Sequence, residues 1–508
     1  MAADQNMRLD PNSPDLPPDR FLYERKGPWP QPSPAHPLKE AAEVLNVPLI
    51  ETAVWDVAVG LRLAADEYGY ASQAAVMALD DMDMEIPTDE EFNNIMLNTA
   101  YTRFMQPLSA FDIARFEKTP AANKLWKYDF SAMNLVKPIE GLYCAPVLVY
   151  FQEDASGARK CVQIIFRKGN STWYDYGPTM GPLWNLAKVY ALQGAIYHML
   201  FVVHPALHFP MDSVNAITKT AVPQIHPLFQ LLYPHTALTL PLDNAVLEGP
   251  GSPVNKNVQG TWFDPFMGDG YNLKLLFGAG YTGLEDPWYG GAYPPYDFMN
   301  PQMGFDSEYG RWLAAYFPPF VDFCTKVATK ILEADKKDTY VARWARYNST
   351  YVRGFPDEKS ILDRDCLARA MAIFMWDVTV SHAGDHYSVG YNVPARYKFL
   401  RIRNYPPPTP PPSRDGPAKI GDVAVVDDLF RAEMAQQLFF QPWGVTSLYS
   451  TSYAFTYRDL QTAAKDFQDA LQTISQGFKY GRDTPFMPFS PLNGNFGTDL
   501  VIPASIQY

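Results

Sequence analysis

The arrangement of the histidines constrains this chain more than any other sequence feature. All but one of its eight histidines fall in two stretches with helical patterns. Two pairs share one spacing, His204-x-x-x-His208 and His382-x-x-x-His386. On a helix, at about 100° per residue, the members of such a pair lie about 40° apart on one face, one turn above the other. Both imidazoles of a pair can therefore reach one ion, and two such helices facing each other would place four nitrogens in the core of a helical bundle.

A buried histidine can also serve the fold alone, through a hydrogen bond to a backbone carbonyl. Two pairs at helical spacing favour metal binding over that alternative. The segment HPALH, residues 204–208, has no Glu after its first His, unlike the H-E-x-x-H of zinc proteases. Imidazole ligands suit Zn, Cu, Fe or Ni, so the ligand type alone leaves the metal open.

Composition and charge predict a globular protein that does not bind nucleic acid. A chain of 508 residues that is 47% hydrophobic and 14% aromatic can bury a large core. With a net charge of -13 and no basic run, the chain lacks the positive surface that binding to a phosphate backbone requires. The N-terminus has no secretory signal pattern, and the four cysteines form no C-x-x-C pair. We therefore expect a cytoplasmic monomer with reduced cysteines.

No run of about 18 purely apolar residues occurs in the chain. The most apolar long stretch, residues 189–209, is interrupted by Gln193, His198 and the pair His204 and His208. We expect no transmembrane segment, while peripheral contact with a membrane stays open.

Hydrophobic periodicity predicts one large, mainly α domain with a small β element. Residues 1–40 are rich in proline and charge, which predicts an extended arm, and residues 41–508 would form the domain. Residues 143–166 contain two β-rich runs separated by the turn sequence DASG, which predicts a hairpin. Helices are expected within residues 38–117, 182–245, 307–334, 361–384 and 423–479.

Two further stretches predict irregular structure. Residues 248–302, which include GDGYNLKLLFGAG, are rich in Gly, Pro and aromatics and predict long loops with short helical turns. The polyproline run at residues 405–417 is typical of a stiff surface connection, with an SH3-type ligand as the less favoured interpretation.

Four segments carry a more specific signal. They are WNLAKVY (184–190), HPLFQLLYPH (226–235), SHAGDHYSVGYNVPARY (381–397) and IPASIQY (502–508). These resemble, in order, the lipoxygenase patterns W-x-L-A-K-x-Y, H-P-x-x-K-L-L-x-P-H, H-A-A-V-N-F-G-Q-Y followed by M-P-N-R-P, and the C-terminal I-P-N-S-I-x-I. The resemblance extends over about residues 95–508. It implies a lipoxygenase-like catalytic domain without the N-terminal β-barrel of plant and animal members.

The resemblance also implies a set of metal ligands. His208, His382 and the carboxylate of the last residue, Tyr508, fall on ligand positions, and His386 stands where the family more often has Asn. The first ligand would be His204. Its H-x-x-x-H spacing is similar to that of fungal members that can use manganese, whereas most of the family has H-x-x-x-x-H. A non-haem iron ion, or alternatively manganese, is implied as the cofactor.

Some residues at positions that are related to the substrate cavity in lipoxygenases differ from the family pattern. Met199 and Val389 stand where lipoxygenases have two Gln that link the metal surroundings to the substrate cavity, and such partners tune a metal. Val246 and Leu247 fall on positions that line the substrate pocket in the family.

Other residues near the histidines have predicted local roles. Asp212, one turn beyond His208, is interpreted either as a hydrogen-bonding group close to the ligands or as a polar residue at a helix end. His226 and His235 are predicted to make structural hydrogen bonds. Pro205 disfavours helical structure at the preceding residue, which predicts a helix that is kinked or that begins at this point.

The resemblance implies a dioxygenase that acts on a polyunsaturated fatty acid in oxylipin metabolism. In that family an M(III)-hydroxide takes a hydrogen atom from the central CH₂ of a cis,cis-1,4-diene, O₂ adds to the radical, and a hydroperoxide leaves. The alternatives are a lipoxygenase-like oxygenase for a specialised polyene natural product, a zinc hydrolase, or an inactive lipid-binding relative.

Overall fold

The structure is a computed structural model. It describes residues 7–8, 21–24, 43–44, 49–116, 125–136, 142–168, 172–242, 270–286, 290–303, 305–398, 401–403, 419–440, 446–478 and 502–506. Most of the predicted N-terminal arm, the polyproline run, Val246, Leu247 and Tyr508 lie outside these residues, so those predictions stay as they are.

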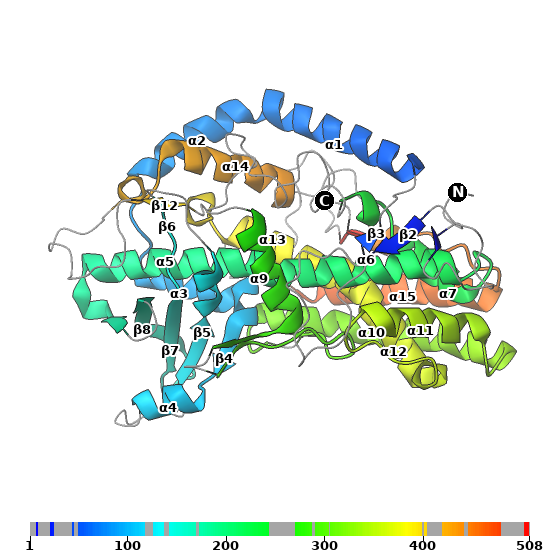
Figure 1. The fold of residues 1–508 in the computed structure, drawn as a ribbon. Coiled ribbons are helices and arrows are strands. Elements are labelled where there is room, and N and C mark those ends of the chain that lie inside the picture. The colour runs from blue at the N-terminus through cyan, green and yellow to red at the C-terminus, as the bar shows by residue number, and fades with distance from the viewer. Residues whose placement is uncertain are drawn as a thin grey trace.

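The described residues are mainly helical, as predicted (Figure 1). The α-helices are α1 (Leu49–Gly69), α2 (Ala71–Asp83), α3 (Asp89–Asn98), α4 (Ala110–Phe116), α5 (Pro182–His198), α6 (His204–Ala221), α7 (Pro227–Leu232), α9 (Gly270–Thr282), α10 (Glu308–Ala334), α11 (Thr339–Tyr351), α12 (Arg364–Trp376), α13 (His382–Asn392), α14 (Val426–Phe440) and α15 (Arg458–Gln476). The strands are β1 (Met7–Arg8), β2 (Phe21–Glu24), β3 (Glu43–Val44), β4 (Met105–Pro107), β5 (Leu125–Asp129), β6 (Leu142–Tyr143), β7 (Val147–Glu153), β8 (Arg159–Lys168), β9 (Thr172–Tyr176), β10 (Leu284–Asp286), β11 (Gly290–Tyr293) and β12 (Ile402–Arg403).

A long helical column crosses the middle of the molecule and organises the rest (Figure 1). It consists of α5, the π-helical segment η6 (Met199–Val203) and α6. The helix does not begin at His204, which corrects one interpretation of Pro205. Proline lacks an N–H and its ring clashes with the carbonyl four residues earlier, so a π-helical turn lets the helix continue through this position. A second π-helical segment, η9 (Asp377–Ser381), joins α12 to α13.

The column is long and apolar enough to cross a membrane by length and composition alone. Its span, Pro182–Lys219, has a mean hydropathy of 1.4 in its most apolar window, and 94% of that window is buried inside the protein. Such burial is typical of the central core helix of a domain. The polar groups that interrupt the apolar run include both histidines of the first pair, of which His208 is buried and His204 is partly buried.

The other elements are arranged around this column (Figure 1). Helices α10, α11, α12 and α15 gather beneath the α6 end, and α10 packs along α12. Helices α1, α2 and α14 arch over the top, and the sheet lies beneath the α5 end. The main hydrophobic core is continuous from the sheet through the column to α10 and α12. One domain therefore encloses both histidine-bearing helices.

The predicted hairpin is confirmed as part of a larger sheet. Within the described residues β4, β5, β7, β8 and β9 form a five-stranded antiparallel sheet in that order, and β7 pairs with β8. One face joins the main core, while Leu148, Tyr150 and Ile165 pack on the other. On that second face the Lys127 ammonium lies 3.0 Å from the Asp112 carboxylate, and both side chains are fully buried. Sequence analysis missed the three remaining strands, which are short.

The prediction of loops over residues 248–302 is wrong for part of that stretch. Residues 270–282 form helix α9, which packs against η6. A Cβ added at Gly280 would lie 2.0 Å from the carbonyl oxygen of Val202, so only glycine permits this close approach. This glycine weakens the helix by its low propensity, but close packing against η6 requires it.

Candidate metal centre

The two predicted histidine pairs meet at the centre of the molecule. His204 and His208 project from α6, and His382 and His386 project from α13. The Nε2 atom of His208 lies 2.9 Å from that of His204 and 3.0 Å from that of His382. The Nε2 atoms of His386 and His204 are 2.9 Å apart. Among the described residues, these four form a group whose ligand atoms all lie within 4.8 Å of one another, which is the arrangement of a metal site.

The spacing of these nitrogens tests which ion they fit. With metal–nitrogen bonds of about 2.1 Å, ligands at 90° to one another stand about 3.0 Å apart, and ligands at tetrahedral angles about 3.4 Å. The observed contacts of 2.9 to 3.0 Å match the 90° angles of an octahedral ion. Four neutral imidazoles at these angles leave room for further ligands. The donor set therefore fits a single metal ion, including the non-haem iron or manganese that the resemblance implies.

Burial keeps these imidazoles neutral, as metal ligands must be. Burial lowers the pKa of His208 to about 4, although the nearby Asp212 carboxylate acts in the opposite direction. The pKa values of His204 and His382 lie well below the ordinary value, first because of burial and then because of the neighbouring histidines. At neutral pH the rings of His204, His208 and His382 therefore each keep a lone pair for an ion.

We predict that the metal-free protein loses stability as the pH falls from 7 to 4. Burial lowers the pKa of His198, His208 and His235 to about 4, whereas an unfolded histidine titrates near 6.5. Between these values the unfolded chain binds protons that the folded protein excludes, so the stabilisation is complete above pH 6.5 and is lost through pH 4. Each residue contributes on the order of 3 kcal/mol. Urea unfolding at several pH values measures the slope.

A matched variant identifies the source of that slope. The ring of His198 packs between Phe104 and Phe130, so a His198→Phe variant should fold and show a flatter pH dependence. An unfolding free energy that stays constant from pH 7 to pH 4.5 would contradict the prediction.

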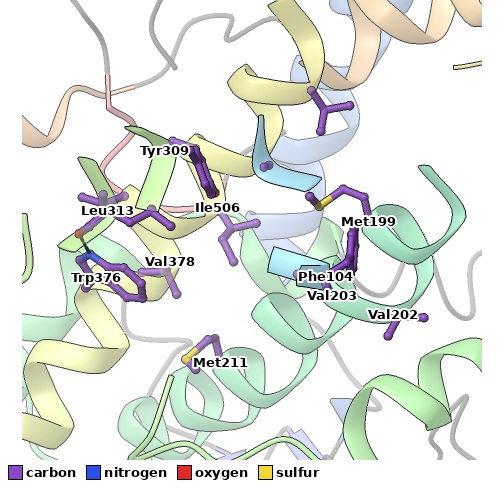
Figure 2. Close-up of a cluster of buried hydrophobic side chains, with 14 of the residues drawn as sticks. Phe104, Met199, Val202, Val203, Met211, Tyr309, Leu313, Trp376, Val378 and Ile506 are labelled. Carbon is purple, nitrogen blue, oxygen red and sulfur yellow. Dashed lines mark hydrogen bonds between the residues drawn. The ribbon is translucent and has the colours of Figure 1, made fainter. Parts of the chain in front are cut away.

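The remaining predicted residues around the ligands are placed as follows. Asp212 is buried and acts electrostatically on His208, and its predicted hydrogen bond close to the ligands stays a prediction. Met199 and Val389 are buried in the apolar core, and neither side chain can donate the hydrogen bonds of a Gln. Figure 2 shows Met199 and Val203 among the buried apolar side chains on the column.

His226 and His235 make the structural hydrogen bonds that were predicted. His226 caps α7: its Nδ1 accepts from the Leu228 N–H at 3.1 Å, and its Nε2 lies 2.9 Å from the Asp338 carboxylate. His235 is fully buried, with Nδ1 2.6 Å from the carbonyl oxygen of Ala504 and Nε2 3.0 Å from the Tyr453 hydroxyl. His235 therefore fastens the C-terminal segment 502–506 to the core.

We predict that a His235→Ala variant binds metal about tenfold more weakly than the wild-type protein, because the segment before Tyr508 loses its anchor. Its unfolding free energy should also fall by about 1–3 kcal/mol, since buried polar partners are left unpaired. Metal titration of the metal-free proteins measures the affinity. A Tyr453→Phe variant is the control: it removes one hydrogen bond of His235 but keeps the contact with Ala504. Equal metal affinity in the wild-type and His235→Ala proteins would contradict this role.

A buried polar cluster beside α13 was not predicted. The guanidinium of Arg103, in the short helix η2 (Ala100–Phe104), donates from Nε to Asp385 at 2.7 Å and from Nη2 to Ser381 at 2.9 Å. The Tyr309 hydroxyl donates to the same Asp385 oxygen. The available signal was Asp385 itself, a carboxylate directly before His386 in a segment predicted as a central helix.

Comparisons with known proteins cover this chain unevenly. No known family profile matches it. Over 300 residues it is 25% identical to the polyunsaturated fatty acid lipoxygenase ALOX15 of Oryctolagus cuniculus, a match that covers 54% of this chain and 43% of that protein. The match therefore spans less than half the length of this curated relative.

Solved structures match more of the chain. The manganese lipoxygenase of Gaeumannomyces graminis has a TM-score of 0.67 at 15% identity, and the match covers 99% of this chain and all of that one. A LOX in complex with arachidonate has a TM-score of 0.65 at 14% identity, with 96% of this chain and 79% of that chain covered. Coral 8R-lipoxygenase has a TM-score of 0.57 at 18% identity, with 77% and 62% covered. At these identities the matches establish the fold.

Proposed function

Because the chain has the lipoxygenase fold that its motifs predicted, we propose that it is a non-haem metal dioxygenase that converts a polyunsaturated fatty acid to a hydroperoxide. The observation that carries the proposal is the convergence of four imidazoles, three of them buried, from two core helices within reach of one ion. When bound, the ion supplies the one-electron redox change that hydrogen-atom abstraction from a diene and reaction with dioxygen require.

The chain's own residues hold and shield this site. His204, His208, His382 and His386 are the proposed ligands, with the carboxylate of Tyr508 as a fifth. The residues directly before the first histidines of each pair belong to η6, which is apolar and largely buried, and to η9, in which the buried Val378 and Val380 alternate with buried polar residues. Figure 2 shows Val203 and Val378 from these segments within one hydrophobic cluster. Such surroundings exclude bulk water and accept an apolar substrate.

The proposed substrate carries a cis,cis-1,4-diene, because hydrogen-atom abstraction is easiest at the CH₂ between two double bonds. One of the similar structures is a complex with arachidonate, and the curated relative is named for polyunsaturated fatty acids. The H-x-x-x-H spacing of His204 and His208, together with the similarity to a manganese lipoxygenase, supports manganese as well as iron.

The decisive experiment measures bound metal on the purified protein, then O₂ uptake and conjugated-diene absorbance with linoleate. Iron or manganese with uptake and diene formation is the expected result. Zinc without uptake would contradict the proposal and favour a hydrolase. Iron or manganese without turnover of linoleate or arachidonate would overturn the fatty-acid substrate and direct the search to other polyenes.

A further inference from the structure

Arg103 contacts the residue that directly precedes each histidine of the α13 pair. Its Nη2 donates to the hydroxyl of Ser381, next to His382, and its Nε donates to the carboxylate of Asp385, next to His386. Ser381 and Asp385 are four residues apart, so they lie one above the other on one helix face. One guanidinium thus spans the same helical turn that presents both imidazoles.

This arrangement is fully buried and well supported. The side chains of Arg103 and Asp385 are 3% and 1% exposed. The Tyr309 hydroxyl of α10 accepts from Arg103 and donates to Asp385, and the guanidinium lies over the rings of Phe305 and Tyr309. Burying a charge is costly unless it is paired and hydrogen-bonded, so this pair persists only because its geometry is satisfied.

Two further contacts fix η2 and α10 against α13. The backbone N–H of Ala100, at the start of η2, donates to the hydroxyl of Ser388 at 2.7 Å. Gly384 faces α10 so closely that an added Cβ would lie 2.9 Å from the Trp312 ring. Helix α13 is therefore held from two sides at the turn that carries its histidines.

The other histidine helix has no such contact among the described residues. The residues directly before His204 and His208 are Val203 and Leu207, which are apolar and packed in the interior. If the fold required only that both helices be rigid, apolar packing could have held α13 as it holds α6. Among the described residues, this polar bridge is therefore found on α13 and not on α6.

We propose that Arg103 is a positioning residue, whose bridge between Ser381 and Asp385 fixes the rotation of α13 so that His382 and His386 face His204 and His208. This inference rests on the metal binding in the proposed function, and not on the identity of the substrate. The bridge requires a planar group with several donors. A lysine at this position carries the same charge but presents a single ammonium, which cannot reproduce the fork.

The test must separate positioning from folding, because removal of one partner leaves a buried unpaired charge and destabilises the protein. An Arg103→Met/Asp385→Leu double variant avoids this problem, since apolar replacement of a buried pair is often neutral for stability. A Lys127→Met/Asp112→Leu double variant of the sheet is the matched control. That pair is equally buried, and its Asp112 also accepts a hydrogen bond from Tyr150, while Lys127 also lies 3.6 Å from the buried Asp129 carboxylate, so this control is the more demanding one for stability.

The experiment titrates each metal-free full-length protein with Mn(II) and records thermal unfolding and the electron paramagnetic resonance spectrum of the bound ion. We expect the Arg103→Met/Asp385→Leu protein to bind Mn(II) about 10–100-fold more weakly than wild type, as is typical when a partner that orients a ligand is lost. Its spectrum should also be altered. The sheet control should bind Mn(II) like wild type and give the wild-type spectrum.

An Arg103→Lys variant completes the test. We expect it to bind Mn(II) more weakly than wild type. A lysine ammonium keeps the charge but cannot donate to Ser381 and Asp385 at once as the guanidinium does, so it does not fix this turn of α13. Wild-type affinity in either Arg103 variant would overturn the inference, and so would a wild-type protein that binds no Mn(II) or Fe(II). A wild-type protein that binds metal without oxygenating linoleate would overturn the fatty-acid dioxygenase alone, because the comparison of Mn(II) affinities would still decide the role of Arg103.

Discussion

A His208→Ala variant is expected to lose bound metal and to reduce O₂ uptake by more than about 100-fold. Loss of a residue that merely orients a ligand costs about 10–100-fold in metal affinity or activity, and loss of a ligand costs more. The Nε2 atom of His208 contacts the Nε2 atoms of both His204 and His382. Removal of this imidazole therefore leaves a gap between two other proposed ligands. Metal content by elemental analysis and O₂ uptake with linoleate measure the effect.

Two further variants test whether the loss of metal and O₂ uptake is specific to the removal of a ligand. A His386→Asn variant should keep most of the metal, because an amide oxygen can replace an imidazole nitrogen as a ligand for iron or manganese. A His226→Asn variant is the control outside the site, since Asn caps a helix nearly as well as the imidazole that caps α7. Wild-type metal content in the His208→Ala protein would remove this histidine from the site.

The sequence predicted the parts of the site that depend on local geometry. The i,i+4 spacing of each pair requires only that its segment be helical, and both segments are. The hairpin was predictable for the same reason, because its two strands are separated by a short turn sequence. The lipoxygenase motifs then predicted that the two helices meet, which spacing alone leaves open.

The sequence did not predict features that arise from packing between distant segments. Arg103 and Asp385 are 282 residues apart, and nothing local to either indicates that they pair. The π-helical turns before His204 and His382 depend on backbone hydrogen bonds that propensities do not encode. Helix α9 was predicted as loop because its glycines lower helix propensity, whereas one of them, Gly280, is required by close contact with the column.

Removal of Tyr508 is expected to abolish O₂ uptake while the metal-free protein stays folded, because residues 502–506 keep their own contacts with the core. The segment before it is held firmly. The Ile502 carbonyl accepts from the Leu448 N–H at 2.7 Å, the Ala504 N–H donates to the Thr446 carbonyl at 2.8 Å, and the Ser505 hydroxyl donates to the Ala237 carbonyl at 3.1 Å.

The position of Ile506 makes the proposed carboxylate ligand feasible. Its side chain is 1% exposed and belongs to the same buried cluster as Tyr309, whose hydroxyl donates to Asp385 beside His386 (Figure 2). The two residues that follow Ile506 can span at most about 7 Å, so the carboxylate would have to bind an ion within that reach.

Three variants separate the carboxylate from the side chain. Deletion of Tyr508 moves the carboxylate back by one residue, and addition of one glycine after Tyr508 moves it forward, so both should lose metal and activity. A Tyr508→Ala variant keeps the carboxylate at its original position and should retain both. Loss of metal and activity in Tyr508→Ala, with both retained in the protein that has one added glycine, would assign the effect to the phenol ring and exclude the carboxylate as a ligand.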